Sequence, residues 1–138
     1  MQIEIVTAKL TNGMLWKGEA TLGLRFALHS ITMNYPCRLI LYKDAAVRNV
    51  EFNRHRQVGE SSAAAVIFEC YSIFGMTKFD LTQPPRRPEY AEFLIQPHKW
   101  EPVVLQPGLA KIPLIVEARS GGSKHKTNFS IILDIEQL

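Results

Sequence analysis

The sequence offers little material for a disulfide framework or a metal site. It has only two cysteines in 138 residues, Cys37 and Cys70, and both lie within apolar, strand-like runs. We expect them to be free, buried thiols, because disulfides are rare in a reducing cytoplasm. The four histidines are far apart in the sequence, and none has a second ligand residue at metal-binding spacing. The sequence therefore predicts no metal and no other cofactor.

Long hydrophobic runs are also missing. The longest apolar stretches, such as AAAVIF at residues 63–68, are far too short to span a bilayer. The opening residues, MQIEIVTAKL, alternate polar and apolar side chains and do not resemble a secretory signal. We therefore expect a protein made in the cytoplasm, with neither a signal peptide nor a transmembrane segment.

Familiar catalytic motifs are absent as well. The sequence has no G-x-S-x-G elbow, and neither cysteine has a histidine nearby. The stretch SGGSK, residues 120–124, has a glycine pair and a lysine but lacks the strand–loop–helix setting of a phosphate-binding loop. The carboxylates are scattered as they are on most protein surfaces. The sequence therefore predicts a protein that is not an enzyme.

What remains is the composition of an ordinary folded protein. Hydrophobic residues make up 46% and charged residues 21%, which favours a packed core over disorder. Sixteen cations against 13 anions give a mixed surface, so nucleic-acid binding is permitted but not implied. This length suits one domain, and we expect residues 1–138 to form it.

Strict alternation of polar and apolar residues decides the fold class. Residues 127–138 and 111–119 each place every second side chain, all apolar, on one face. Seven further stretches are strand candidates: residues 2–10, 14–20, 21–30, 37–43, 65–74, 90–97 and 101–106. Many short strands that must each bury one face predict an all-β fold. We expect an antiparallel β-sandwich, jelly-roll or Ig-like, with eight or nine strands.

Three details of this sandwich can be predicted. Residues 37–43 and 65–74 are apolar on both faces, so both should be central strands. In residues 21–30 the inward face should hold Leu22, Leu24, Phe26 and Leu28. The last two strands are joined by SGGSKHK, whose paired glycines allow positive φ, and this favours a β-hairpin.

One segment, near residues 44–56, has the signals of a short helix instead. Asp44 is a good N-cap residue, and alanines that favour helix follow it. At helical spacing a central carboxylate is flanked by two guanidinium groups, while Val47 and Val50 should face the sandwich. The predicted structural salt-bridge set is Arg48, Glu51 and Arg54.

A basic loop at residues 119–126 is the main candidate for binding. It contains Arg119, Lys124, His125 and Lys126. Such a loop could bind nucleic acid, an anionic glycan or an acidic partner, and a merely solvated loop is the simpler interpretation. Proteins that bind single-stranded nucleic acid stack its bases on aromatic residues, and no series of aromatic residues accompanies this loop. Nucleic acid is therefore an unfavoured partner.

Several stretches in residues 38–138 carry a family resemblance. They are RLILYKDAAVRNVEFNR, AAVIFECYS, DLTQPP, KIPLIVEARSGG and FSIILDIEQL. Their order resembles small β-sandwich domains in structural proteins of tailed bacteriophages, found among tail, fibre and baseplate-associated products. The positions that match the family pattern are Arg48, Glu51 and Arg54 for an Arg–acid–Arg set, Glu69 for the end of a buried strand, and Leu81 with Pro84 for a leucine–proline pair.

The resemblance implies a non-enzymatic structural or adhesion component of a phage virion, made in the host cytoplasm. The Arg–Glu–Arg set would hold the connection between two strands onto the sandwich. Partners would be other virion proteins or copies of this chain, through outer-face residues such as Ile40, Ile115 and Ile132. Two alternatives stay open: a lectin-like module that binds a glycan, for instance on a host surface, and an anion or nucleic-acid binder that uses loop 119–126.

Overall fold

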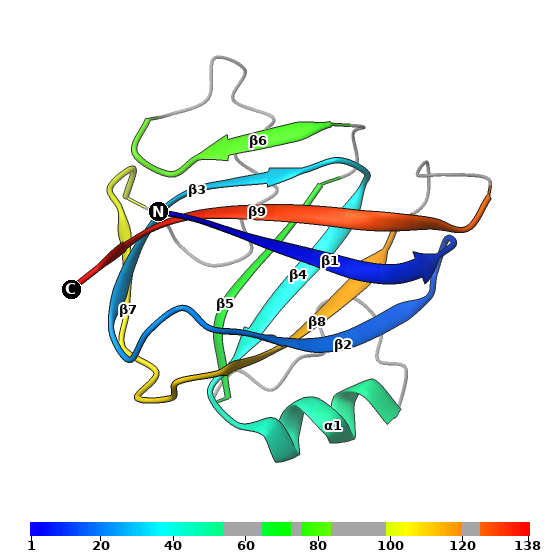
Figure 1. The fold of residues 1–138 in the computed structure, drawn as a ribbon, viewed down its shortest axis with the longest axis horizontal. Coiled ribbons are helices and arrows are strands. Elements are labelled where there is room, and N and C mark those ends of the chain that lie inside the picture. The colour runs from blue at the N-terminus through cyan, green and yellow to red at the C-terminus, as the bar shows by residue number, and fades with distance from the viewer. Residues whose placement is uncertain (54–64, 73–75, 84–98, 120–124) are drawn as a thin grey trace.

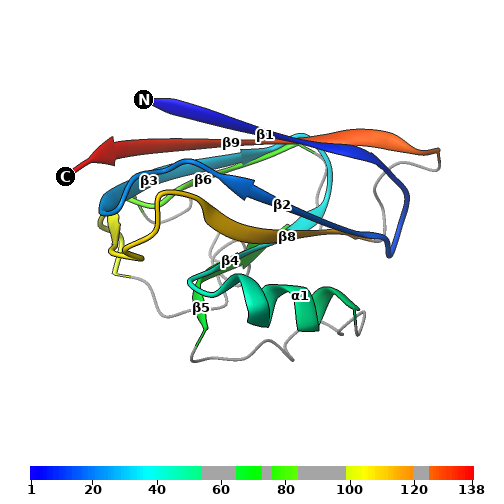
Figure 2. The same ribbon diagram turned by 60° about the horizontal axis from the view of Figure 1, so that its bottom comes forward.

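The protein is a sandwich of two antiparallel sheets, seen in a computed structural model that describes residues 1–53, 65–72, 76–83, 99–119 and 125–138 (Figures 1 and 2). Sheet A has the order β1 (Gln2–Leu10), β9 (Thr127–Gln137), β3 (Phe26–Met33) and β6 (Thr77–Asp80), and β7 (Val103–Leu105) also pairs with β3. Sheet B has the order β2 (Leu15–Ala20), β8 (Ile112–Ala118), β4 (Cys37–Tyr42) and β5 (Val66–Tyr71). The predicted all-β sandwich is confirmed.

The strand pairing is that of a jelly roll. Apart from β7, the early strands pair with the late ones in reverse order: β1 with β9, β2 with β8, β3 with β6, and β4 with β5. This is one long antiparallel ribbon rolled into two sheets, and it folds back on itself at the pair of β4 with β5 in sheet B. Of the two predicted sandwich topologies, the pairing therefore selects the jelly roll.

The predicted hairpin between the last two strands is wrong for the same reason. Strand β8 pairs with β2 and β4 in sheet B, whereas β9 pairs with β1 and β3 in sheet A. Packed sheets lie about 10 Å apart, and a loop of this length can cross that distance. The glycine pair lies outside the described residues, and the segment that contains it connects a strand of sheet B to a strand of sheet A.

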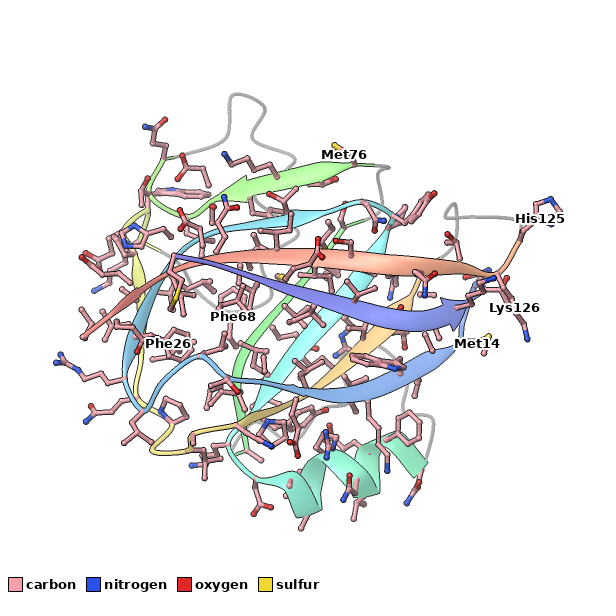
Figure 3. All side chains as sticks on the ribbon, viewed as in Figure 1. Met14, Phe26, Phe68, Met76, His125 and Lys126 are labelled. Atoms are coloured by element: carbon pink, nitrogen blue, oxygen red, sulfur yellow. The ribbon has the colours of Figure 1, made fainter. Side chains whose placement is uncertain are left out.

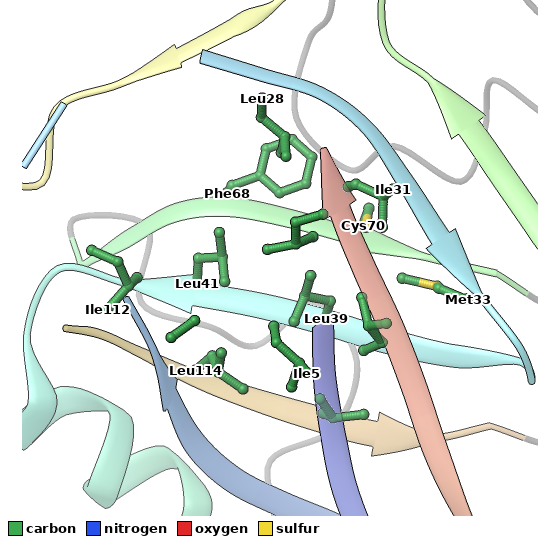
Figure 4. Close-up of a cluster of buried hydrophobic side chains, with 14 of the residues drawn as sticks. Ile5, Leu28, Ile31, Met33, Leu39, Leu41, Phe68, Cys70, Ile112 and Leu114 are labelled. Carbon is green, nitrogen blue, oxygen red and sulfur yellow. The ribbon is translucent and has the colours of Figure 1, made fainter. Parts of the chain in front are cut away.

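The core lies between the sheets and draws on strands of both (Figure 4). Its side chains include Ile5 from β1, Leu28 and Ile31 from β3, Leu39 from β4 and Phe68 from β5. The alternating apolar residues predicted for β8 and β9 are all buried. Burial of this apolar surface is the main force that holds the two sheets together.

Strand β3 departs from simple alternation. Its inward residues are Phe26 and Leu28, then Ile31 and Met33, because the register with β9 shifts at His29. A β-bulge of one residue restores the apolar side chains to the core. The predicted inward position of Leu24 is wrong, since that side chain precedes the strand and is 59% exposed.

The remaining strand predictions have different outcomes. Strand β4 is central and buried along its whole length, as predicted, but β5 comes last in the order of sheet B. Strand β6 was not predicted, because its four residues contain one inward apolar side chain, Phe79, and no alternation can be detected. The strand candidate at residues 90–97 lies outside the described residues.

The predicted helix is present as α1 (Ala45–Asn53), which lies on the outer side of sheet B (Figure 2). Asp44 caps it as expected: its Oδ1 accepts hydrogen bonds from the backbone N–H groups of Ala46 at 2.8 Å and Val47 at 3.4 Å. Among the described residues, no helix combines the length and apolarity needed to cross a bilayer.

Candidate functional site

The outer side of sheet B carries a set of charged and hydroxyl side chains under α1. We call this surface the covered face; it comprises Arg38, Ile40 and Tyr42 of β4, Glu69 of β5, Ile115 and Glu117 of β8, and Arg48 and Glu51 of α1. The helix packs against β2, β4 and β8, so it covers the part of this surface that those three strands form. Charged groups are seldom buried unless they are paired, and their partners therefore decide what the cluster can do.

Arg38 and Glu69 form an ion pair and hydrogen bond across neighbouring strands. They are diagonal neighbours on one side of the ladder, because Arg38 pairs with Tyr71 and Glu69 with Ile40. Both are nearly inaccessible, with exposed fractions of 1% and 5%. Burial lowers the pKa of Arg38 from its usual value, while the nearby Glu117 carboxylate opposes that shift. The guanidinium nevertheless stays charged at any ordinary pH.

The other carboxylate of the covered face belongs to α1. Glu51 is 4% exposed and accepts a hydrogen bond from the Tyr42 hydroxyl on β4. Arg48, also buried, donates from Nη1 to the Gly18 carbonyl at 2.6 Å and from Nε to Asn49 Oδ1 at 2.8 Å. The two residues thus tie the helix to β4 and to β2, which fits the scaffolding role expected for them.

The remaining expectations for the helix have different outcomes. Arg54, the third member of the predicted salt-bridge set, lies outside the described residues, so the pairing of the whole set stays a prediction. Val47 packs against the small apolar cluster on sheet B, as predicted. Val50 does not, because it lies on the solvent side of α1 and is 48% exposed. The positions that face the sheet are held partly by Arg48 and Glu51 instead.

Among the described residues of the covered face, the charged groups surround a very small cavity. A cavity of about 10 Å³ is lined by Arg38, Tyr42, Glu51 and Glu117 together with apolar neighbours. That volume is about what one water molecule requires. This cavity between the described side chains therefore has no room for a substrate of ordinary size.

The predicted binding loop is only partly available. Arg119 donates from Nη1 to Glu117 Oε1 at 3.2 Å, and its guanidinium carbon lies 5.2 Å from the centre of the Tyr71 ring. His125 and Lys126 are exposed at the start of β9 (Figure 3), and Lys124 lies outside the described residues. Arg119 is thus held against the sandwich, whereas His125 and Lys126 are presented to solvent.

The two cysteines are free and buried, as expected. They lie on the inner side of neighbouring strands of sheet B, where Leu39 is the residue paired with Cys70. Burial raises the pKa of the Cys37 thiol to about 12 and that of Cys70 well above its usual value. Both thiols are therefore protonated at neutral pH, and they are poor nucleophiles.

The outer side of sheet A is the opposite case. We call it the open face; it comprises Gln2, Glu4, Val6 and Lys9 of β1, Asn128, Ser130, Ile132, Asp134 and Glu136 of β9, Ser30 and Thr32 of β3, and Lys78 and Asp80 of β6. Among the described elements, no helix or strand packs against it. It presents a mixture of charged, small polar and aliphatic side chains to solvent.

A shallow groove of about 660 Å³ lies at one end of this face. Its lining includes Ala27, Val104, Lys99, Glu101 and Glu136. Among the described residues, the lining contains no aromatic side chain on which a sugar ring could stack. This groove therefore gives the glycan-binding alternative little support.

The sequence-based search missed Arg38 and Tyr42 as members of the covered face. A usable signal existed, because Arg38 is the single charged residue in the apolar run CRLILY and Glu69 is the single one in VIFECY. Two lone charges of opposite sign in adjacent buried strands predict a pair, since neither could be buried alone.

Comparison with known proteins adds no family. A scan of protein-family models, a search of curated proteins and a search of solved structures each return no match. Among the described residues, no group of three His, Cys, Asp or Glu side chains is arranged to hold a metal ion.

Proposed function

We propose that this chain is a non-enzymatic structural component of a phage virion, associated with the tail, fibre or baseplate, and that it acts through protein–protein assembly. One observation carries the proposal: the two outer sides of the sandwich differ. The charged side chains of the covered face are buried and bonded within the molecule, whereas the open face presents its side chains to solvent.

The covered face is better suited to scaffolding than to chemistry. Catalytic acids and bases must reach a substrate, whereas Arg38, Glu69 and Glu51 are buried and each contacts other groups of the same molecule. The apolar residues Ile40 and Ile115, which the sequence suggested as outer-face contacts, are also covered, with exposed fractions of 4% and 3%. Assembly through this sheet would require the helix to leave.

The fold is compatible with this role. Jelly rolls occur in viral capsid domains and in lectins, although a fold alone does not assign a function. The resemblance of residues 38–138 to phage tail domains favours the virion role over the lectin role. The groove without aromatic lining points the same way.

The test is to purify phage particles from cultures that produce this chain and to quantify the chain across a density gradient by mass spectrometry. We expect it to sediment with the particles at a constant ratio to another virion protein. A cytoplasmic host protein serves as the control for adhering material. The proposal would be contradicted if the chain were recovered only at the top of the gradient, in the same fractions as the cytoplasmic host protein.

A further inference from the structure

The strand register arranges the open face in rows that cross sheet A. Directly paired residues share a face, so Asp134 lies between Gln2 and Ser30, and Asp80 lies beyond Ser30. The next row reads Glu4, Ile132, Thr32 and Lys78. Toward the start of β9 come Ser130 opposite Val6, and then Asn128 opposite Lys9. The face is thus a defined grid of side chains.

This grid is acidic at one end and basic at the other. Asp80, Asp134 and Glu136 lie toward the end of β9, and Lys9 lies toward its start. His125 and Lys126 come directly before that start (Figure 3). His29 Nε2 lies 3.5 Å from Glu136 and the amino-terminal nitrogen 3.7 Å from Asp134, yet these two carboxylate side chains remain 63% and 44% exposed. Both charged ends are accessible to a partner.

Between the charged ends, the centre of the open face combines aliphatic and small hydroxyl side chains and has no net charge. Ile132, Ser130 and Thr32 lie on the two inner strands of the sheet, and Val6, beside Ser130 on the edge strand, is 51% exposed. Glu4 and Lys78, of opposite charge, lie at the two sides of the middle row. Such a centre can pack against another sheet without burying a net charge.

We propose that the open face binds the open face of a second copy, with the strands of the two copies running in opposite directions. A two-fold axis in the interface, perpendicular to the strands, places the basic end of each copy over the acidic end of the other. An axis parallel to the strands would place acid over acid and base over base. The charge pattern therefore selects the first arrangement and brings Lys126 of one copy over Glu136 of the other.

The expected size of the interface predicts a weak dimer. The face is four strands wide, because β6 and β7 both pair with β3. Strands spaced about 4.8 Å apart and roughly eight residues long cover about 500 Å² per copy. A total of about 1,000 Å² is near the lower limit for a specific interface, so association should depend on concentration. This inference rests on the proposed assembly function and names its partner.

Sedimentation equilibrium of the wild-type chain over a wide concentration range tests the dimer directly. We expect a monomer–dimer equilibrium that shifts toward monomer at 0.5 M salt, since salt screens exposed charges. A chain that stays monomeric at every concentration would overturn the inference. So would a dimer whose stability does not change with salt.

Charge-reversal variants test the arrangement. Lys126→Glu and Glu136→Lys should each raise the dimer Kd at least tenfold, because each creates two like-charge contacts across the two-fold axis. An equimolar mixture of the two variants should dimerise again, since every such contact then joins opposite charges. A mixture that stays monomeric while the wild type dimerises would exclude this orientation.

The matched control is Lys111→Glu, an exposed lysine next to β8 of sheet B. It makes the same charge change away from the open face and should leave the Kd within twofold of the wild-type value. Particle association is measured separately with the same variants. A monomer that joins particles would overturn this inference alone, and a dimer that never joins them would overturn the proposed function alone.

Discussion

The two outer sides of this sandwich differ in where they place their charged side chains. On the covered face, the charged and hydroxyl groups are buried within the molecule, where Arg38 of β4 pairs with Glu69 of β5 and Tyr42 of β4 binds Glu51 of α1. On the open face, the charges stay in water at the two ends of the sheet. Burial makes each contact of the first face important for stability, while exposure leaves the second face free for a partner.

The largest expected effect is on the Arg38–Glu69 pair. Glu69→Ala should lower the free energy of unfolding by about 3 to 5 kcal/mol, because it leaves a buried guanidinium without its carboxylate. Chemical denaturation measures the change. The control Val6→Ala on the open face should cost less than about 0.5 kcal/mol. Equal losses from the two variants would abolish the distinction between the faces.

The buried Cys37 thiol, on the inner side of β4, predicts that the free energy of unfolding falls at alkaline pH. The Cys37 pKa is raised to about 12 in the folded protein, so its contribution to stability is complete below the ordinary thiol pKa and decreases as pH rises toward 12. Between about pH 9 and 12 this thiol should remove about 1.4 kcal/mol of unfolding free energy per pH unit. Denaturation curves across this range, compared with those of Cys37→Ala, isolate the effect. An unchanged slope in the variant would disprove it.

The hydrogen bond between Glu51 and Tyr42 should be the next in size. Glu51→Ala should cost about 1 to 3 kcal/mol, because the Tyr42 hydroxyl then lies buried beneath α1 without that acceptor. Val50→Ala, on the exposed side of the same helix, is the control and should change stability by less than about 0.5 kcal/mol. A loss as large for Val50→Ala would contradict the role of the covered face, because alanine favours the helix more than valine does.

The smallest expected effect is at the start of the helix. Asp44→Ala removes the acceptor for two backbone N–H groups and should cost about 1 kcal/mol. Asp44→Asn is the control, since it keeps a capping oxygen and should restore most of the loss. If both variants lose the same stability, the charge of Asp44 near the helix start matters more than the cap.

Much of the fold could be predicted from the sequence because alternation reports directly on burial. Strands β8 and β9 and the cap at Asp44 follow from local pattern alone. Strand β6 and the bulge at His29 could not be predicted, since both depend on the neighbour with which a strand pairs. The wrong hairpin has the same origin: glycines indicate that the chain turns, but not to which sheet it goes.

The candidate site was half predicted for a similar reason. Spacing alone placed Arg48 and Glu51 on one helix face, and both are buried there. Their partners, the Gly18 carbonyl and the Tyr42 hydroxyl, lie on other elements and are brought near by the rolled ribbon. Sequence spacing contains no information about such contacts.

The ribbon pairing also affects how the chain must be synthesised. Strand β1 forms its ladder with β9, which is synthesised last of the described strands. The Thr7 hydroxyl, for example, accepts a hydrogen bond from the backbone N–H of Phe129, 122 residues later in the chain. Until then β1 is an unpaired edge on the ribosome, and contacts this distant in sequence form slowly. We therefore expect nascent chains to depend on chaperones until the final strand emerges, more than a protein of similar size built from local hairpins would.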